Sequence, residues 1–280
     1  MRRWRLNSGY NATTDQRRTK AGTIPMLKHN MERNLGVFST GDIVTSGLVL
    51  HLDAGNAASY PGSGTVWTDI SGNGNNGTLT NAPTYSSANG GAIVFDGSND
   101  YVSIGSQNII GTGNAPYTTE FWLYNTKNFA SGAYSIIYRL KQDTETLFVF
   151  YNNAGTLLMW SAFRNEAQLS LPITISDYLN KWVCVSLVYN GGGKSTASSY
   201  TYYRNGVSLG SGSTNLGNAG GVGSNCNLIG LDGNATTPCN VVTTSGQIQG
   251  NLAAFKVYNR ALSATEVTQN YNALRGRYGL

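Results

Sequence analysis

The sequence has little charge, few cysteines and no long hydrophobic run. Only 12% of its 280 residues are charged, about half of the roughly 25% typical of globular domains. No stretch approaches the roughly 20 apolar residues of a membrane span. No apolar segment of the kind found in secretory signals follows Met1-Arg2-Arg3-Trp4-Arg5. We therefore expect no membrane contact and no signal peptide.

Three cysteines are too few for a fold held together by disulfides. Cys184 lies in the apolar run 182–185, which predicts a buried thiol on a strand. Cys226 and Cys239 flank a loop rich in Gly, Asn and Thr. An oxidising compartment would allow these two to pair and a reducing cytoplasm would keep them free, so the sequence leaves their pairing open.

The chain is rich in glycine and tyrosine, with 35 and 17 residues respectively. Short β-branched and aromatic runs alternate with clusters of Gly, Asn, Ser and Thr, a pattern typical of many strands joined by turns. The predicted strands are 48–52, 92–95, 101–104, 121–124, 135–138, 147–151, 157–160, 182–189, 200–203, 207–209, 228–230 and 251–258. So many short strands predict two stacked antiparallel sheets or a barrel.

A single helix is predicted near the end of the chain, at about 263–275. Ser263 and Glu266 form a capping box, in which each side chain accepts a hydrogen bond from the other's backbone amide. Val267, Tyr271 and Leu274 then form one apolar stripe. Gly276 is the predicted stop.

Positive charge is concentrated at the N-terminus. Residues 1–34 hold eight basic and two acidic side chains, a net charge of +6, and the remaining eleven basic and twelve acidic residues give −1. We interpret residues 1–44 as an extended basic arm that gains structure on binding an acidic partner. A protein partner is favoured over nucleic acid because few aromatics are interleaved for base stacking. The predicted contact residues are Arg2, Arg3, Trp4, Arg5, Arg17, Arg18 and Lys20.

Four segments after the arm resemble the concanavalin-A-like, laminin-G jelly-roll superfamily. They are Ala92–Val102, Thr118–Leu123, the pair Lys181–Val185 and Tyr203–Gly206, and Gly250–Ser263. The resemblance spans about 45–275. It implies an all-β, two-sheet antiparallel jelly-roll sandwich at 45–280, with an extended N-terminal arm and a short C-terminal helix.

The stretch from Gly47 to Thr80 is similar to laminin-G domains of tailed-phage structural proteins. That resemblance implies a virion protein assembled in the host cytoplasm. The favoured hypothesis is a capsid decoration protein, held to capsid or other virion proteins through the arm, with a homo-oligomer left open. The alternative is a carbohydrate-binding adhesin that recognises a host surface glycan. A secreted cell-surface lectin is disfavoured by the missing signal.

No catalytic residues are predicted. Glucanases that share this fold place two carboxylates on one strand face through a Glu-x-Asp-x-x-Glu run. Asp143-Thr144-Glu145 lacks the third acid, and Glu120 has no acidic partner two residues on. His51 lies on an apolar strand, where a packed histidine is more common than a base. We therefore expect a binding or structural protein that needs no cofactor.

Calcium is the one metal considered, because laminin-G-like domains often hold it with loop oxygens. Turn formation is the favoured role of the same residues, since Asp and Asn side chains commonly accept bonds from their own backbone. The candidate ligands are Asp53, Asn56, Asp96 and Asp100, with Asp69, Asn73 and Asn99 nearby in sequence.

A glycan site would need aromatic platforms at a loop edge. The candidate platforms are Tyr60, Trp67, Tyr85 and Trp160. Trp122 and Trp182 are instead expected in the core, since any sandwich buries aromatic residues.

Overall fold

The computed structural model describes residues 41–128, 130, 133–141, 146–153, 156–161, 168–192, 199–212, 226–231, 233–234, 240–241 and 246–280. Side chains are not described at 134, 146–153, 156–161, 168–173, 212, 233–234 and 240–241. The seven arm residues predicted to contact a partner lie outside the described residues, and their role stays a prediction. Within this part of the chain no helix is long and apolar enough to cross a bilayer.

The first of two large antiparallel sheets carries the longest strands. Its order is β14-β13-β12-β7-β18-β5-β4, and β1 pairs with β18 outside this path. These eight strands, among the described residues, are β1 (Leu48–Asp53), β4 (Thr84–Ser86), β5 (Ala92–Asp96), β7 (Tyr117–Asn125), β12 (Trp182–Tyr189), β13 (Tyr200–Arg204), β14 (Val207–Gly212) and β18 (Gln249–Tyr258).

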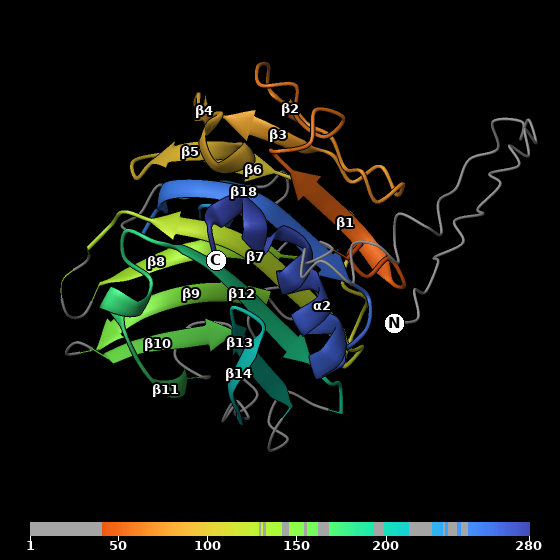
Figure 1. The fold of residues 1–280 in the computed structure, drawn as a ribbon, viewed down its shortest axis with the longest axis vertical. Coiled ribbons are helices and arrows are strands. Elements are labelled where there is room, and N and C mark those ends of the chain that lie inside the picture. Colours follow the sequence, from red (N-terminus) through yellow and green to blue (C-terminus); the bar gives the residue numbers. More distant parts are fainter. Residues whose placement is uncertain are drawn as a thin grey trace, which may run out of the picture. The chain divides into compact units, whose positions relative to one another are not determined.

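The second sheet has the order β11-β10-β9-β8-β15-β6-β3-β2. These eight strands, in the described part of the chain, are β2 (Val66–Trp67), β3 (Gly77–Thr80), β6 (Tyr101–Ser103), β8 (Tyr134–Leu140), β9 (Thr146–Asn153), β10 (Thr156–Ser161), β11 (Gln168–Thr174) and β15 (Leu228–Ile229). A small separate pair joins β16 (Gly233–Asn234) to β17 (Asn240–Val241). Figure 1 shows the two large sheets as the layers of a sandwich, which confirms the predicted fold class.

The main core lies between the sheets, where side chains from alternate strand positions meet. On β7, Phe121 and Leu123 point into this core, together with Phe255 from β18 and Tyr138 from β8. Trp122 belongs to a second cluster, on the opposite face of β7. The strand is buried on both faces because a helix covers its outer side, which explains its nearly continuous burial.

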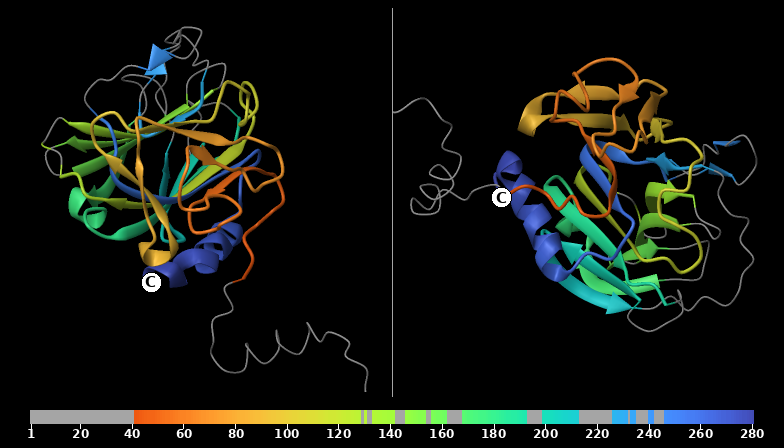
Figure 2. Two further views of the ribbon diagram at one scale, coloured as in Figure 1. Left: turned by 90° about the horizontal axis from the view of Figure 1, so that it is seen from above. Right: turned by 90° about the vertical axis from the view of Figure 1, so that its right-hand side faces the viewer.

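The covering helix is α2 (Ala264–Leu274), which lies on the outer side of the first sheet in Figures 1 and 2. The capping box of Ser263 and Glu266 is confirmed. The predicted helix end is confirmed, because α2 ends at Leu274 with Arg275 as its C-cap and Gly276 next to it. The chain then continues as the 3₁₀ helix η3 (Arg275–Tyr278) and turns at Gly279 with φ +70°. The remaining short 3₁₀ helices are η1 (Ala88–Gly90) and η2 (Ile175–Asp177).

Candidate functional site

A depression of about 410 Å³, which we call the amide pocket, gathers residues from both ends of the domain. The lining residues come from β1, from the loops that precede β3 and β7, and from the residue that follows β18. Five side-chain amides and two aliphatic side chains line it, and no ionisable group is among the lining residues. The lining consists of Val49, Asn73, Asn75, Gln107, Asn108, Ile109, Gly111 and Asn259.

The loop that carries Asn73 and Asn75 is organised by the buried carboxylate of Asp69. One oxygen of Asp69 accepts from the backbone amides of His51 and Ser71, both at 2.9 Å. The other accepts from the hydroxyl of Ser71 and the amide of Asn75, also at 2.9 Å. Asp69 therefore fastens this loop to β1 and holds its two asparagines beside the strand.

Asn73 and Asn75 also bind β1 directly. The Nδ2 of Asn73 donates to the carbonyl of Leu48 at 3.2 Å and to the hydroxyl of Ser71 at 3.0 Å. The Nδ2 of Asn75 donates to the carbonyl of Val49 at 2.7 Å. These bonds fix both amide planes against the strand.

Gln107 joins the second loop to the first. Its Nε2 donates to the carbonyl of Ile104 at 2.7 Å and to Oδ1 of Asn75 at 2.9 Å. Fully buried Asn227 holds the backbone beneath it, since its Nδ2 donates to the carbonyls of Gly105 and Gln107 at 3.2 and 2.8 Å. The pocket wall formed by Gln107 is therefore cross-linked from two sides.

Asn108 and Asn259 complete the polar lining and are exposed. Their side-chain amides make no hydrogen bond within the part of the chain that the structure describes. A Cβ at Gly47, where φ is +75°, would lie 3.0 Å from Oδ1 of Asn259. Glycine at position 47 therefore leaves room for the Asn259 amide.

The predicted aromatic platform is only partly present. Trp67 is fully buried in the core between the sheets and Tyr60 is 4% exposed, which contradicts their predicted role as exposed sugar platforms. The rings of Tyr60 and half-buried Tyr85 pack 5.5 Å apart at 49°. The Tyr60 hydroxyl donates to the carbonyl of Gly64 at 2.8 Å, so this ring stabilises its own loop.

Trp160 lies on β10, but its side chain is outside the described residues, and its predicted role stays a prediction. Trp122 and Trp182 are buried, as expected, and both pack against Tyr278, with ring centroids 4.2 and 4.6 Å apart. These two indoles face α2 and not the inter-sheet core.

Asp53 and Asn56, the first two calcium candidates, already accept hydrogen bonds from other protein groups. Arg277 donates from Nη1 and Nη2 to the two carboxylate oxygens of Asp53, both at 2.7 Å. Burial alone would raise the pKa of Asp53, but the Arg277 hydrogen bonds and charge and the Gly55 amide lower it below its ordinary value. Oδ1 of Asn56 accepts from the amide of Ala58 at 3.0 Å.

The second pair forms a turn. Oδ1 of Asp96 accepts from the amide of Ser98 at 2.7 Å, and Oδ2 of Asp100 accepts from the amide of Asp96 at 3.0 Å. Among the described residues, no three His, Cys, Asp or Glu side chains are placed to hold a metal. The turn role of these four residues is therefore confirmed, and calcium binding stays a prediction.

The domain also buries charged groups where no ligand can reach them. Lys256 and Glu120 are both fully buried, with Nζ of Lys256 2.5 Å from Oε1 of Glu120. The other oxygen of Glu120 accepts from Ser186 at 3.2 Å and from Asn270 of α2 at 3.3 Å. Glu120 is thus a structural group between sheet and helix.

His51 is paired with Lys256 across β1 and β18. Burial and the Lys256 charge lower the pKa of His51 to about 4. The imidazole is neutral at pH 7, which agrees with the packed histidine expected from its strand.

Cys184 is a free and buried cysteine, as predicted. Burial, and to a lesser degree the Glu120 charge, raise the pKa of its thiol well above the ordinary value. Cys226 is disulfide-bonded, whereas Cys239 lies outside the described residues.

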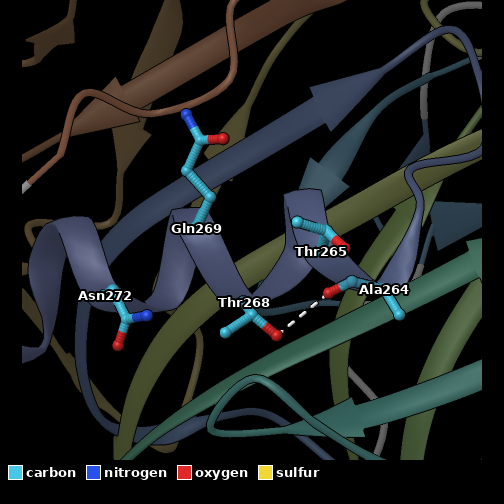
Figure 3. Close-up of a pocket in the computed structure, with 5 residues that line it drawn as sticks. All are labelled: Ala264, Thr265, Thr268, Gln269 and Asn272. Atoms are coloured by element: carbon cyan, nitrogen blue, oxygen red, sulfur yellow. Dashed lines mark hydrogen bonds between the residues drawn. The ribbon is translucent and has the colours of Figure 1, made fainter.

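A second depression, of about 460 Å³, follows the outer face of α2 (Figure 3). Figure 3 shows the side chains of Gln269 and Asn272 pointing in opposite directions. Thr268 donates to the carbonyls of Ala264 and Gly206 at 2.9 and 3.0 Å, and Gln269 donates to that of Asp42 at 2.8 Å. Because these groups do not converge on one point, we favour the amide pocket as the candidate site.

Matches to known families support the fold. A family described as the concanavalin A-like lectin/glucanases superfamily matches residues 96–268, more than half of the chain. The chain belongs to this superfamily. A comparison with curated protein sequences finds no match.

Several solved structures resemble this chain at low sequence identity. Domain 4 of AbnA, a GH43 extracellular arabinanase from Geobacillus stearothermophilus in complex with arabinotriose, is 16% identical with a TM-score of 0.53, covering 81% of this chain and 98% of that one. The binding domain of Paraclostridial Mosquitocidal Protein 1 is 16% identical with a TM-score of 0.58, covering 81% and 52%.

The botulinum neurotoxin type G receptor-binding domain is 18% identical with a TM-score of 0.51, covering 81% of this chain and 51% of that one. The matched region therefore corresponds to about half of each toxin fragment. At these identities the likeness establishes a shared fold for the sandwich.

Proposed function

We propose that this concanavalin A-like domain binds a carbohydrate at the amide pocket without changing it chemically. The observation that carries the proposal is the lining: five side-chain amides, two aliphatic side chains and no ionisable group. Amides supply both donors and acceptors to hydroxyl groups. Half-buried Val49 supplies apolar surface for the C–H groups of a sugar ring.

Catalysis has no support at this site. Glycoside hydrolysis needs a pair of carboxylates beside the scissile bond, and the described lining contains none. Of the acids compared with the glucanase pattern, Glu120 is fully buried and paired with Lys256, and Asp143 and Glu145 lie outside the described residues. We therefore propose a binding domain and not a glycosidase.

The resemblances favour the same class of function. The arabinanase domain was solved with arabinotriose, and the two toxin structures are described as binding or receptor-binding domains. They share only the fold with this chain, so they support carbohydrate binding without indicating which sugar is bound.

The test is a glycan and polysaccharide array probed with the full chain at pH 7, followed by calorimetry with arabinotriose as the first soluble probe. We expect selective binding. Asn108→Trp should abolish it by filling the exposed rim of the pocket, whereas Asn272→Trp, which adds the same bulk to the outer face of α2, should leave it unchanged. An array with no selective signal would refute the proposal.

Decoration of a virion remains a separate prediction. It is motivated by the basic segment 1–44 and by the similarity of Gly47–Thr80 to phage structural domains. None of the resemblances found bears on it. Deleting residues 1–40 should leave a folded sandwich that no longer joins particles, and normal incorporation of the truncated chain would refute it.

A further inference from the structure

We infer that the amide pocket selects uncharged, hydroxyl-rich sugars over acidic ones through the fixed carbonyl oxygens of Asn73 and Gln107, with Asn108 and Asn259 as its adjustable contacts. This inference rests on the proposed function, because it assigns the ligand class of the same site. It follows from a difference among the five amides: three of them already donate hydrogen bonds to the protein, and two make no side-chain hydrogen bond among the described residues.

Three of the amides turn their N–H groups toward the protein. Asn73 and Asn75 donate to β1, and Gln107 donates to Ile104 and Asn75. An amide nitrogen has two hydrogens, so Asn73 and Gln107, with two bonds each, have none left for a ligand. Their carbonyl oxygens are the atoms that remain.

The two remaining carbonyl oxygens accept hydrogen bonds and cannot donate them. A sugar hydroxyl can donate to Asn73 Oδ1 or Gln107 Oε1. A carboxylate at pH 7 has no hydrogen to donate, so it would place negative charge beside oxygens that carry partial negative charge. Since the inward bonds prevent either amide from rotating, neither Asn73 nor Gln107 can turn an N–H toward an acidic sugar.

Two cations of the described residues lie beside these loops, and each is bonded to the protein. Nζ of Lys141 donates to the carbonyl of Ser106 at 2.6 Å, directed at the loop backbone. Arg260, which follows Asn259, makes a bidentate pair with Glu266 at 2.9 and 2.6 Å. Arg260 is therefore neutralised by Glu266, whereas Lys141 keeps its charge but is held against the loop backbone.

Asn108 and Asn259 provide the adjustable contacts. Both are exposed, and their side-chain amides have no hydrogen-bond partner among the described residues. Each can present a donor to a ring or hydroxyl oxygen and an acceptor to a hydroxyl hydrogen. A ligand therefore meets fixed acceptors from Asn73 and Gln107 and rotatable amides from Asn108 and Asn259.

The experiment is isothermal titration of the full chain with matched neutral and acidic sugars. The pairs are galacturonate trisaccharide with its carboxyl-reduced counterpart, and 3′-sialyllactose with lactose; arabinotriose is a further neutral probe. In any pair that binds, we expect the neutral member to bind at least about tenfold more tightly, equivalent to about 1.4 kcal/mol.

Aspartate variants test the two adjustable residues because they keep the shape of asparagine while replacing its donor with negative charge. We expect Asn108→Asp and Asn259→Asp each to weaken neutral-sugar binding about five- to tenfold, the range of one hydrogen bond. Asn272→Asp on α2 is the matched control and should have no effect.

The outcomes separate this inference from the function beneath it. Tighter binding of the acidic member, or unchanged sugar binding by both aspartate variants, would overturn the inference while leaving carbohydrate binding intact. Absence of binding to every sugar here and on the array would overturn both.

Discussion

Replacing Lys256 by methionine would test how the buried ion pair stabilises the domain. Lys256 and Glu120 are both fully buried, and the Glu120 carboxylate also accepts from Ser186 and Asn270. Methionine has nearly the volume of the lysine side chain without its charge. The substitution therefore leaves a carboxylate that two neutral hydrogen bonds alone must stabilise inside the protein.

Removing one partner of a buried pair typically costs about 3–5 kcal/mol, because the remaining charge has lost both water and its counter-ion. Stability of a domain is commonly about 5–15 kcal/mol, so Lys256→Met should remove a large part of it. The assay is urea unfolding at pH 7, followed by tryptophan fluorescence. Lys181→Met, at an exposed lysine, is the control and should change stability by less than about 0.5 kcal/mol.

The double variant Glu120→Gln, Lys256→Met separates charge from packing. Glutamine keeps an oxygen for Ser186 and Asn270 but carries no charge. We expect the free energy of unfolding of the double variant to exceed that of Lys256→Met by at least about 2 kcal/mol, since the uncompensated charge is gone. The argument fails if Lys256→Met unfolds like the wild type, or if adding Glu120→Gln gives no recovery.

Two further perturbations concern pH and the C-terminus. The pKa of His51 is about 4 in the fold and about 6.5 unfolded, so protonation favours unfolding and up to about 3 kcal/mol of stability should be lost as pH falls from 6.5 to 4. Urea unfolding at pH 7 and pH 4.5 should show a smaller loss of stability in His51→Leu than in the wild type, and an unchanged loss in His29→Gln. Equal losses in the two variants would contradict this role of His51. Arg277→Leu leaves buried Asp53 unpaired and should lower the free energy of unfolding, measured in urea, by about 3 kcal/mol. Arg277→Lys keeps the charge and should lower it by about 1–2 kcal/mol. Equal losses in the two variants would show that the charge is unimportant.

The elements that sequence predicted best are those whose signals are local. Asn205 and Gly206 have φ of +51° and +76° and join β13 to β14, as their type I′ turn signature indicates. Ser263 and Glu266 cap α2 through bonds spanning three residues. In both cases the residues that make the structure are neighbours in the chain.

The features that the sequence did not predict depended on distant packing. The α-helix ends before Gly276, as predicted, but the chain continues as η3, and the Tyr278 ring stacks 4.2 Å from Trp122 of β7. Trp67 follows a glycine-rich loop and resembles an exposed platform in sequence. In the fold it enters the core beside Gly77, where a Cβ would meet Val102 at 2.6 Å.

The amide pocket was missed because no segment carries its pattern. Val49, Asn73 and Asn75 lie near the start of the domain, Gln107 precedes β7, and Asn259 follows the last strand. Antiparallel pairing of β1 with β18 brings these ends together. The Asn-Gly run before β3 indicates a turn, but the hydrogen bonds that orient its amides form only when β1 lies beside it.

The same packing explains why a polar but uncharged site can form in this domain. Glu120, Lys256, Asp53 and Asp69 are buried and bonded to other parts of the protein. Their bonds connect sheet, helix and loop and hold β1 and β18 in place. The amide pocket lies where those two strands begin and end, so its walls are set by the buried charges while its surface presents only neutral groups. Sugar recognition by pre-positioned amides needs that combination, because orientation fixed before binding lowers the entropic cost of association.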